Sequence, residues 1–332
     1  MKRIKEMINQ VIIDSSTLSA HYLFLDGFIF TSVHGPANVF NGIVVRNPEN
    51  AECHSPKYGF SDRTFEEHIR FIQENELEKA VVIAEDISFL TRCPSLKHLY
   101  IIPANTAPDE FDYSPLYCMP EIQSLTCTTE YGPHEELRGT LNYGRIQGLR
   151  YVNANGPGHE TINQIPHIEK LWVGRLGKKI DSMEALFTSP DLKDLDCVQC
   201  SFQNLKGIER AKKLESLSLQ YNRSLSDISA LSGCRHSLRS LAICACGKIQ
   251  DFSVLDQLDQ LEHLELMGSN TLPNLRFLSN MKKLKTFSFS MNVLDGDLSF
   301  CLSVPYVNSE KNRKHYNYKD SELPKELPQN RI

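Results

Sequence analysis

The sequence lacks any hydrophobic stretch long enough to span a membrane. A spanning helix needs about 20 consecutive apolar residues, and no segment of the 332-residue chain approaches that length. The basic start Met-Lys-Arg is also followed by polar residues before a signal-peptide core can form, namely Glu6, Asn9, Gln10 and Asp14. We therefore expect neither secretion nor a membrane partner, and the cytoplasm is the expected location.

Positive charge is not in excess either. The chain has 36 Lys and Arg against 41 Asp and Glu, a formal net charge of −5. A protein that binds a phosphate backbone usually carries a basic footprint. The most basic segment, residues 310–320, has four positive and two negative side chains, so we interpret it as a solvated surface. We expect no nucleic-acid partner.

The sequence also lacks the short motifs of common enzyme classes. It contains no phosphate-binding loop, no His-Glu-x-x-His and no Gly-x-Ser-x-Gly elbow. The segment that begins at His134 breaks the zinc pattern, because Arg138 stands where a second histidine is required. The pair Gly156 and Gly158 lacks the third glycine of a dinucleotide-binding turn. We therefore expect a protein that is not an enzyme and has no cofactor or metal.

What the sequence does contain is an internal repeat of the form apolar-x-x-apolar-x-apolar. Its first positions are 19 to 27 residues apart, close to the period of about 20 to 29 residues of leucine-rich repeats. Nine units share the pattern: Leu96/Leu99/Ile101, Ile122/Leu125/Cys127, Leu149/Val152/Ala154, Ile168/Leu171/Val173, Leu192/Leu195/Cys197, Leu214/Leu217/Leu219, Leu238/Leu241/Ile243, Leu261/Leu264/Leu266 and Leu284/Phe287/Phe289. One unit cannot bury its apolar face alone, so the units are expected to stack into an α/β solenoid with one continuous core.

Two further features of each unit extend the match. Asn222 and Asn292 stand at the ninth position, where an amide can bridge the backbones of neighbouring coils. The return segments also match one another, as in the Asp-Ile-x-x-Leu of residues 227–231. These features resemble the repeats of the short bacterial class found in internalin-type proteins, over roughly residues 77–309. The resemblance implies a right-handed solenoid with a curved parallel sheet, and adhesion to host proteins. Because export signals and an Ig-like segment are missing, we expect an intracellular protein partner instead.

The two ends of the solenoid are expected to carry caps, because an exposed terminal coil is a sticky edge. A hairpin is predicted around Asp26-Gly27, and a second one around Asn41-Gly42. A helix is predicted over residues 64–75, with Thr64 and Glu67 as a capping box. The predicted organisation is an N-terminal β-rich cap over 1–63, the solenoid over 64–309, and a C-terminal cap with a polar tail over 310–332.

The ten cysteines suit core positions better than a metal or disulfide site. Small apolar side chains are expected at the repeat positions that eight of them occupy: Cys93, Cys118, Cys127, Cys197, Cys200, Cys234, Cys246 and Cys301. Cys53 and Cys244 are not assigned by the repeat. Unpaired thiols of this kind fit a reducing compartment.

The outward side chains of the strands define the candidate binding surface. The third, fifth and seventh repeat positions should point out of the concave sheet because side chains alternate along a strand, beginning with His98, Tyr100 and Ile102. Trp172, the one tryptophan, falls at an outward fifth position on a central coil. Aromatic and charged residues around it have the composition of an interface hot spot. The candidate site consists of Tyr151, Asn153, Lys170, Trp172, Arg175, Asp194, Asp196, Tyr221, His263 and Glu265.

The function predicted from these residues is a non-catalytic protein-interaction module, acting as adaptor, inhibitor or scaffold and working as a monomer. The first alternative is a carbohydrate-binding surface, for which the outward tyrosines and Trp172 would also serve. The second is a hydrolase that uses Asp194 and Asp196, or His263 and Glu265. A simpler reading of the central coils also stays open: Trp172 packs as an ordinary sheet residue, and Lys170 and Asp194 form a cross-strand pair.

Overall fold

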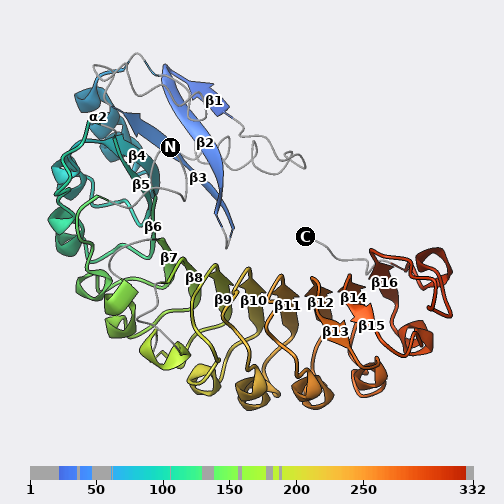
Figure 1. The fold of residues 1–332 in the computed structure, drawn as a ribbon. Coiled ribbons are helices and arrows are strands. Elements are labelled where there is room, and N and C mark those ends of the chain that lie inside the picture. The colour runs from blue at the N-terminus through green and yellow to red at the C-terminus, as the bar shows by residue number, and fades with distance from the viewer. Residues whose placement is uncertain are drawn as a thin grey trace. The chain divides into compact units, whose positions relative to one another are not determined.

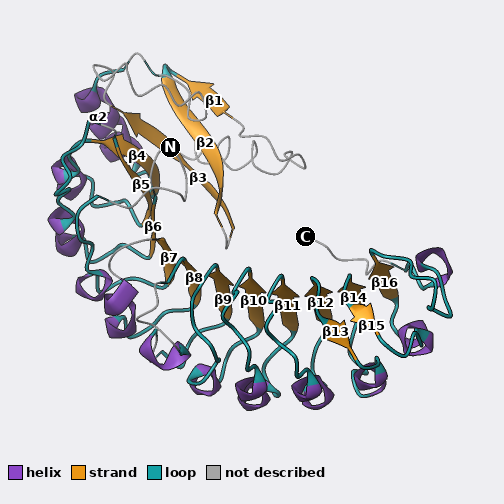
Figure 2. Cartoon of the chain, viewed as in Figure 1, coloured by secondary structure: helices purple, strands orange, loops and turns teal. Residues whose placement is uncertain are grey.

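The chain folds into two compact units, Met1–Ile168 and Glu169–Ile332. The computed structural model describes residues 22–35, 38–46, 61, 63–104, 106–128, 138–155, 159–176, 182–186 and 189–326, as traced in Figure 1. In each unit the parallel strands lie side by side, and short 3₁₀ helices of the return segments lie on the other side (Figure 2). The predicted leucine-rich-repeat solenoid is confirmed. The division after residue 168 falls within the series of repeats, with repeat units on both sides of it. The domain boundaries proposed after residues 63 and 309 therefore stay predictions.

The first unit begins with antiparallel strands and continues with parallel ones. Its strands are β1 (Tyr22–Leu25), β2 (Phe28–Gly35), β3 (Asn38–Arg46), β4 (Lys79–Ala84), β5 (His98–Pro103), β6 (Ser124–Cys127) and β7 (Tyr151–Asn155). Its helices are α2 (Phe65–Asn75) and the 3₁₀ helices η2 (Ser88–Arg92), η3 (Ser114–Cys118), η4 (Tyr143–Arg145) and η5 (His159–Gln164). β1, β2 and β3 pair antiparallel, and β3 to β7 pair parallel in chain order.

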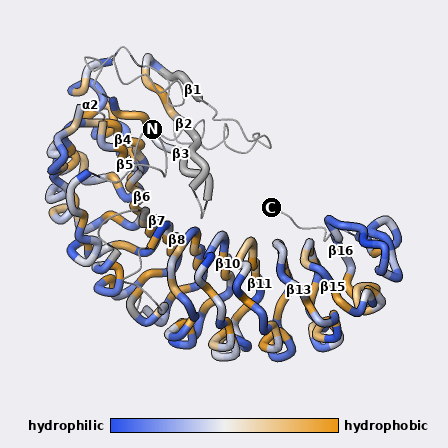
Figure 3. The backbone as a smooth tube through the Cα atoms, in the orientation of Figure 1, coloured by the Kyte–Doolittle hydropathy of each residue, from blue (hydrophilic) through white to orange (hydrophobic). Residues whose placement is uncertain are grey.

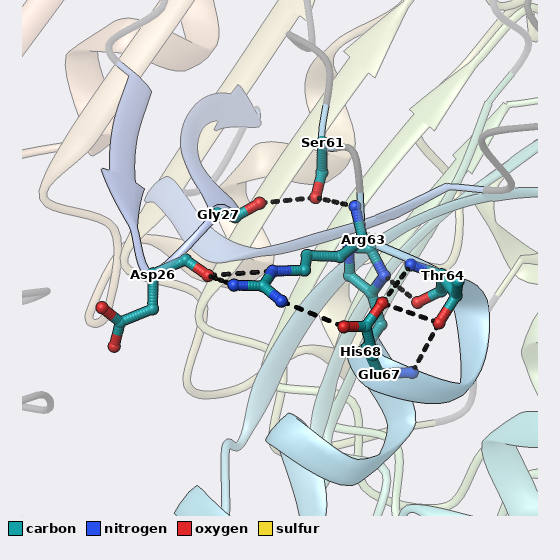
Figure 4. Close-up of polar contacts among 7 residues, drawn as sticks. All are labelled: Asp26, Gly27, Ser61, Arg63, Thr64, Glu67 and His68. Atoms are coloured by element: carbon teal, nitrogen blue, oxygen red, sulfur yellow. Dashed lines mark hydrogen bonds and ion pairs between the residues drawn. The ribbon is translucent and has the colours of Figure 1, made fainter.

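The predicted Asp-Gly hairpin forms between β1 and β2. Asp26 and Gly27 both have positive φ angles, 52° and 83°, as a two-residue turn between right-twisted strands requires. Figure 4 shows how this turn is attached to the start of α2. The Arg63 guanidinium donates to the Asp26 carbonyl from Nε at 3.1 Å and from Nη2 at 2.8 Å, and to Glu67 from Nη1 at 3.0 Å. The Ser61 hydroxyl donates to the Gly27 carbonyl at 2.6 Å, so the hairpin and the helix are held together by side chain to backbone bonds.

The predicted Asn-Gly hairpin is wrong. Asn41 and Gly42 lie inside the continuous strand β3, opposite Ser32 and Thr31 of β2. A Cβ atom at Gly42 would stand 3.0 Å from backbone atoms of Lys79 and Ala80 on β4. The glycine therefore permits a close backbone approach within the sheet rather than a turn.

Helix α2 begins and ends as predicted. The Thr64 hydroxyl accepts from the backbone N–H of Glu67, and the Glu67 carboxylate accepts in return from the backbone of Thr64, which completes the capping box. Ile69 and Ile72 on its inner face are buried, and Phe65 packs edge-on against Phe89 at 4.5 Å between ring centroids. No helix in the part of the chain that the structure describes is long and apolar enough to cross a membrane.

The expectation that outward residues of the first coils lie on an open surface is wrong for Tyr100 and Ile102. Both are buried, in one apolar cluster with Ile29, Val44, Val81 and Ile83. β4 and β5 are near-continuous apolar runs, and such strands are typical of sheets covered on both faces. In these coils the sheet therefore has hydrophobic packing on its outward as well as its inward side.

The second unit is built of parallel strands in strict register. Its strands are β8 (Lys170–Gly174), β9 (Asp194–Val198), β10 (Ser216–Gln220), β11 (Ser240–Cys244), β12 (His263–Met267), β13 (Thr271–Leu272), β14 (Thr286–Phe289), β15 (Asn292–Val293) and β16 (Tyr306–Ser309). Its 3₁₀ helices are η6 (Met183–Ala185), η7 (Ile208–Arg210), η8 (Ser229–Cys234), η9 (Ser253–Gln257), η10 (Arg276–Ser279), η11 (Ser299–Ser303) and η12 (Asp320–Glu322). The main sheet runs β8, β9, β10, β11, β12, β14, β16, and β13 pairs with β15 beside it.

The apolar repeat positions form the core of this unit. Leu195, Leu217 and Leu241 pair along the sheet, and each is 1% exposed. Along each strand the residues on either side of the leucine are partly exposed. β9, β10 and β11 therefore alternate between buried and half-buried positions. Figure 3 shows that hydrophilic (blue) and hydrophobic (orange) segments follow one another along the coils. We call the half-buried side of β8–β12, β14 and β16 the strand face.

The predicted asparagine bridge between coils is present at Asn222. This side chain is fully buried, accepts from the Cys200 N–H at 2.7 Å and donates to the Cys197 carbonyl at 3.0 Å. Its amide therefore points inward, although Asn222 begins an Asn-Arg-Ser glycosylation sequon. In the β12 coil the bridging role falls to Asn270, which donates to the Cys246 and Ile249 carbonyls. Asn270 stands at the tenth rather than the ninth position, because this coil has one extra residue after the strand.

Most of the described cysteines occupy the core as predicted. Seven are buried: Cys93, Cys127, Cys197, Cys200, Cys234, Cys246 and Cys301. Cys118 is a correction, because it is exposed at the end of η3, while Pro115 and Leu116 fill the core there. Cys53 lies outside the described residues. Every described cysteine is a free thiol.

The segment after β16 folds back onto the edge of the sheet. Val307 of β16 donates its N–H to the Pro324 carbonyl at 2.9 Å, and Glu326 donates to the Pro305 carbonyl at 3.0 Å. The Ser309 N–H donates to the Asp320 carboxylate at 2.7 Å. The backbone groups on the outer edge of β16 are therefore paired within the chain.

Candidate functional site

Four predicted site residues lie together on the first two strands of the second unit. In the register of β8 and β9, Lys170 stands beside Asp194 and Trp172 stands beside Asp196. All four side chains occupy half-buried positions of the strand face. Neighbouring strands lie about 4.8 Å apart, so these four side chains form one continuous patch of the strand face. They therefore occupy the outward strand positions that the alternation of the repeat predicts, and their role in binding stays a prediction.

Lys170 and Asp194 form a direct ion pair. The ammonium nitrogen lies 2.8 Å from a carboxylate oxygen, with 29% and 33% of the two side chains exposed. Partly exposed pairs of this kind contribute about 0.2 to 1 kcal/mol. The pair thus has the geometry of an ordinary cross-strand pair, and its main effect is to hold both charges in place beside Trp172 and Asp196.

Asp196 lies in a less favourable environment than Asp194. The pKa of its carboxyl group is raised to about 6 from an ordinary value of 3.8: burial and, less strongly, the negative charge of Asp194 raise it, and the Ser218 hydrogen bond and Lys170 oppose this rise. Ser218, on the neighbouring strand β10, also accepts from the Gln220 amide at 2.9 Å. Gln220, Ser218 and Asp196 therefore form a polar chain across the strand face. An ionised carboxylate at this position costs stability.

We expect Asp196→Asn to stabilise the fold above neutral pH. Because the folded-state pKa is raised, protonated Asp196 favours folding at low pH, and this contribution is lost as the pH rises through 6. The amide mimics the protonated acid, so the variant should be more stable by about 1 to 2 kcal/mol at about pH 8 after allowance for solvent screening. At about pH 4 the two proteins should be nearly equally stable. Urea unfolding at both pH values measures the difference, and equal stability at the higher pH would contradict the assignment.

A row of residues with left-handed backbone borders the strand face at the ends of the strands. Arg175, Gln199 and Tyr221 each have φ of 55°, and Ala245 has φ of 54°. The N–H of each donates to a carbonyl at the end of the next strand, at 2.8 to 2.9 Å. Residues other than glycine adopt this backbone conformation at a cost of roughly 1 to 2 kcal/mol each. We call Arg175, Gln199 and Tyr221 the rim row.

The rim row directs three long side chains outward on consecutive coils. The Tyr221 side chain is 51% exposed, the largest exposed aromatic group among the described residues. The Arg175 guanidinium donates to the Gln199 amide oxygen at 3.3 Å. Arg175 and Tyr221 were predicted as site residues, whereas Gln199 was not. Its signal in the sequence was its place between them at the position after each strand.

His263 and Glu265 lie apart from this cluster, and their side chains form hydrogen bonds with different partners. They belong to β12, three strands from β9, which corresponds to roughly 14 Å across the sheet. A ring nitrogen of His263 hydrogen-bonds to the Thr286 hydroxyl at 2.8 Å, and Glu265 accepts from the Cys244 thiol at 3.3 Å. Burial, together with the Glu265 carboxylate, raises the pKa of the Cys244 thiol to about 12, so this thiol is not activated as a nucleophile.

Tyr151 and Asn153 complete the predicted set on β7 of the first unit. Both are half-buried and stand beside Ser124 and Thr126 of β6. The described residues contain no group of three or more His, Cys, Asp or Glu side chains placed to hold a metal ion. The strand face and the rim row of the second unit are therefore the best-defined candidate site. Ser218 and Gln220 join it, although sequence reasoning had marked them only as outward residues.

Comparison with known proteins supports the fold. No protein-family model matches the chain, and no curated protein matches it in sequence. Among solved structures it is similar to an internalin, InlF, from Listeria monocytogenes, with a TM-score of 0.52 and 18% identity over 70% of this chain and 66% of that one. It also matches a leucine-rich-repeat protein from Leptospira interrogans, with a TM-score of 0.43 and 15% identity over 76% and 59% of the two chains. The predicted resemblance to internalin-type repeats is confirmed at the level of the fold.

Proposed function

We propose that the chain is a non-catalytic protein-interaction module that binds its partner on the strand face and rim row of β8, β9 and β10. The binding surface has Trp172, Asp196 and the Lys170–Asp194 pair at its centre and the rim row at its border. Aromatic, arginine and partly desolvated charged side chains at one place are typical of the energetic centre of an interface. A concave repeat surface is also the surface that solenoid proteins commonly use for binding.

The observation that carries this proposal is that residues which lower the stability of the fold lie on the proposed binding surface. Asp196 is a carboxylate with a raised pKa, and the rim row has left-handed backbone without glycine. The corresponding residue of the β12 coil is Gly268, and that of the β11 coil is the small Ala245. Strained or electrostatically unfavourable residues collect at functional sites more often than elsewhere. The left-handed backbone continues at Ala245 of the β11 coil, but of these four coils it is β8, β9 and β10 that carry a long side chain there, close to the half-buried Trp172 and to Asp196.

Glycine substitutions in the rim row test the proposal. Tyr221→Gly should leave stability unchanged or raise it by up to about 1 kcal/mol, because glycine adopts positive φ freely. The same change should lower affinity for the partner by about tenfold or more if the phenol ring is part of the interface. The measurement is the melting temperature, together with comparative affinity purification of partners from the native cell.

Ala245→Gly is the matched control, because it relieves the same backbone conformation one coil further along without removing a long side chain. A protein retained by the wild type and by Ala245→Gly, but lost with Tyr221→Gly, identifies the partner. Equal retention by all three proteins would contradict the proposed surface. Retention of glycans, in place of a protein, would favour the carbohydrate-binding alternative.

The state of the cysteines supports a reducing compartment, and the cytoplasm remains the proposed location. The nine described cysteines are unpaired, and most are buried. Free thiols persist where glutathione and thioredoxin keep proteins reduced, whereas exported proteins commonly form disulfides. We further propose that the protein acts as an adaptor, inhibitor or scaffold, and as a monomer.

A further inference from the structure

The ionisable groups of the strand face are unequally distributed around Trp172. On β8 and β9 they are one cation, Lys170, and two carboxylates, Asp194 and Asp196. Lys170 is paired with Asp194 at 2.8 Å. Asp196 has its hydrogen bond with the neutral hydroxyl of Ser218 on the other side. The strand positions of β8 and β9 therefore have a net charge of −1, while the Arg175 guanidinium of the rim row lies beyond the end of β8 and donates to Gln199.

From this charge we propose that the strand face binds a Lys or Arg side chain of the partner, seated between Trp172 and Asp196, on a segment that crosses the coils in extended form. This inference rests on the proposed function, which it makes specific. A cation here would meet a carboxylate in a partly desolvated site, where such a bond is stronger than in water. Trp172 stands beside Asp196 in the register, so the cation would also lie next to an indole, the aromatic group that binds cations best.

The rim row supports the extended form of the bound segment. Arg175, Gln199 and Tyr221 repeat once per coil, about 4.8 Å apart, along a line parallel to the row of Trp172 and Asp196. Guanidinium, amide and phenol groups can donate hydrogen bonds to backbone carbonyls of a chain laid across the strand ends. The donors of the rim row and the carboxylate of the strand face then contact the backbone and the side chain of the same segment.

Binding of a cation should depend on the ionisation of Asp196. The groups that face this carboxyl are Lys170 on β8 and Asp194 on β9, while the outward residues of β10, namely Ser216, Ser218 and Gln220, do not titrate. A cationic side chain binds the ionised form and therefore lowers its pKa from about 6. Affinity should be constant above about pH 7 and fall as Asp196 becomes protonated, by about tenfold at pH 5.

End-blocked peptides of the form Gly-Ser-Gly-X-Gly-Ser-Gly, with X as Arg, Lys, citrulline or Glu, test the inference. Binding to the full chain is followed by the fluorescence of Trp172, the single tryptophan. The Arg and Lys peptides should shift the emission, and the citrulline and Glu peptides should bind about tenfold more weakly or not at all. Asp196→Asn should reduce binding of the Arg peptide about tenfold and abolish its pH dependence.

Glu215→Gln is the control, because it removes the same charge from an exposed side chain just before β10 and outside the strand face. It should bind the Arg peptide as the wild type does. The inference is overturned if the Arg peptide gives no shift, if citrulline or Glu peptides bind as well as Arg, or if Asp196→Asn keeps the pH dependence. In those cases the partner lost from Tyr221→Gly would still show that the surface binds a protein, so failure of the inference is separable from failure of the proposed function.

Discussion

Trp172→Ala is expected to abolish most of the partner affinity while leaving the fold almost as stable as before. Trp172 lies on the strand face rather than in the core, and surface substitutions usually change stability by about 0.5 kcal/mol or less. Truncation of a central aromatic anchor costs about 2 kcal/mol or more of binding energy, which is about 30-fold in affinity. Calorimetric melting and titration with the purified partner measure the two effects on the same protein.

The fluorescence of the wild type provides an independent check on the same residue. An indole on the strand face should emit at long wavelength in the free protein, and its emission should shift to the blue when the partner covers it. Blue emission in the free protein, combined with a strongly destabilised alanine variant, would assign Trp172 to the packing between coils. The proposed site would then have to be abandoned.

Asn222→Ala is expected to be among the most destabilising single substitutions in the second unit. The variant leaves the Cys200 N–H and the Cys197 carbonyl buried without their side-chain partner. Each unsatisfied buried backbone group costs about 1 to 3 kcal/mol, so a loss of about 2 to 4 kcal/mol is expected after partial relaxation. Chemical denaturation measures this loss as a lower midpoint, with little change in the slope.

Asn292→Ala is the matched comparison, because Asn292 occupies the same repeat position in the last of the nine repeat units. Its side chain is only half-buried, and its amide oxygen has no hydrogen-bond partner. The loss at this position should be clearly smaller than at Asn222. If both variants lose the same stability, the loss would come from replacing asparagine in this turn of the coil, and not from the buried bridge between coils.

The solenoid was predictable because its period recurs in every unit. Each of the positions held by Leu195, Leu217 and Leu241 is an independent instance of one pattern, and stacking leaves a single arrangement that buries them all. The first coils were harder to predict because they depart from this pattern. Gly42 was predicted as a turn residue, since a sequence shows that glycine is needed but not whether the reason is a turn or a close approach of β4. Tyr100 has a repeat position that predicts exposure, and its burial depends on neighbours from other strands.

The candidate site was predictable in part for the same reason. Side chains alternate along a strand, so the outward directions of Trp172 and Asp196 followed from counting along the repeat. The raised pKa of Asp196 did not, because it depends on burial by side chains of adjacent coils and on the pairing of Lys170 with Asp194 rather than with Asp196. The left-handed conformation of Gln199 also has no local marker, since neither glycine nor asparagine stands there.

The hydrogen bonds on the outer edge of β16 limit how copies of this chain can associate. A parallel sheet grows by adding a strand to an edge whose backbone groups are free, and repeat proteins with such edges can polymerise end to end. Here Val307 and Ser309 already donate to Pro324 and Asp320 of the same chain, and Lys325 stands opposite Tyr306. An incoming strand would have to displace these contacts and approach a lysine side chain. Within the described residues, the outer edge of β16 is therefore not free for filament growth by strand addition.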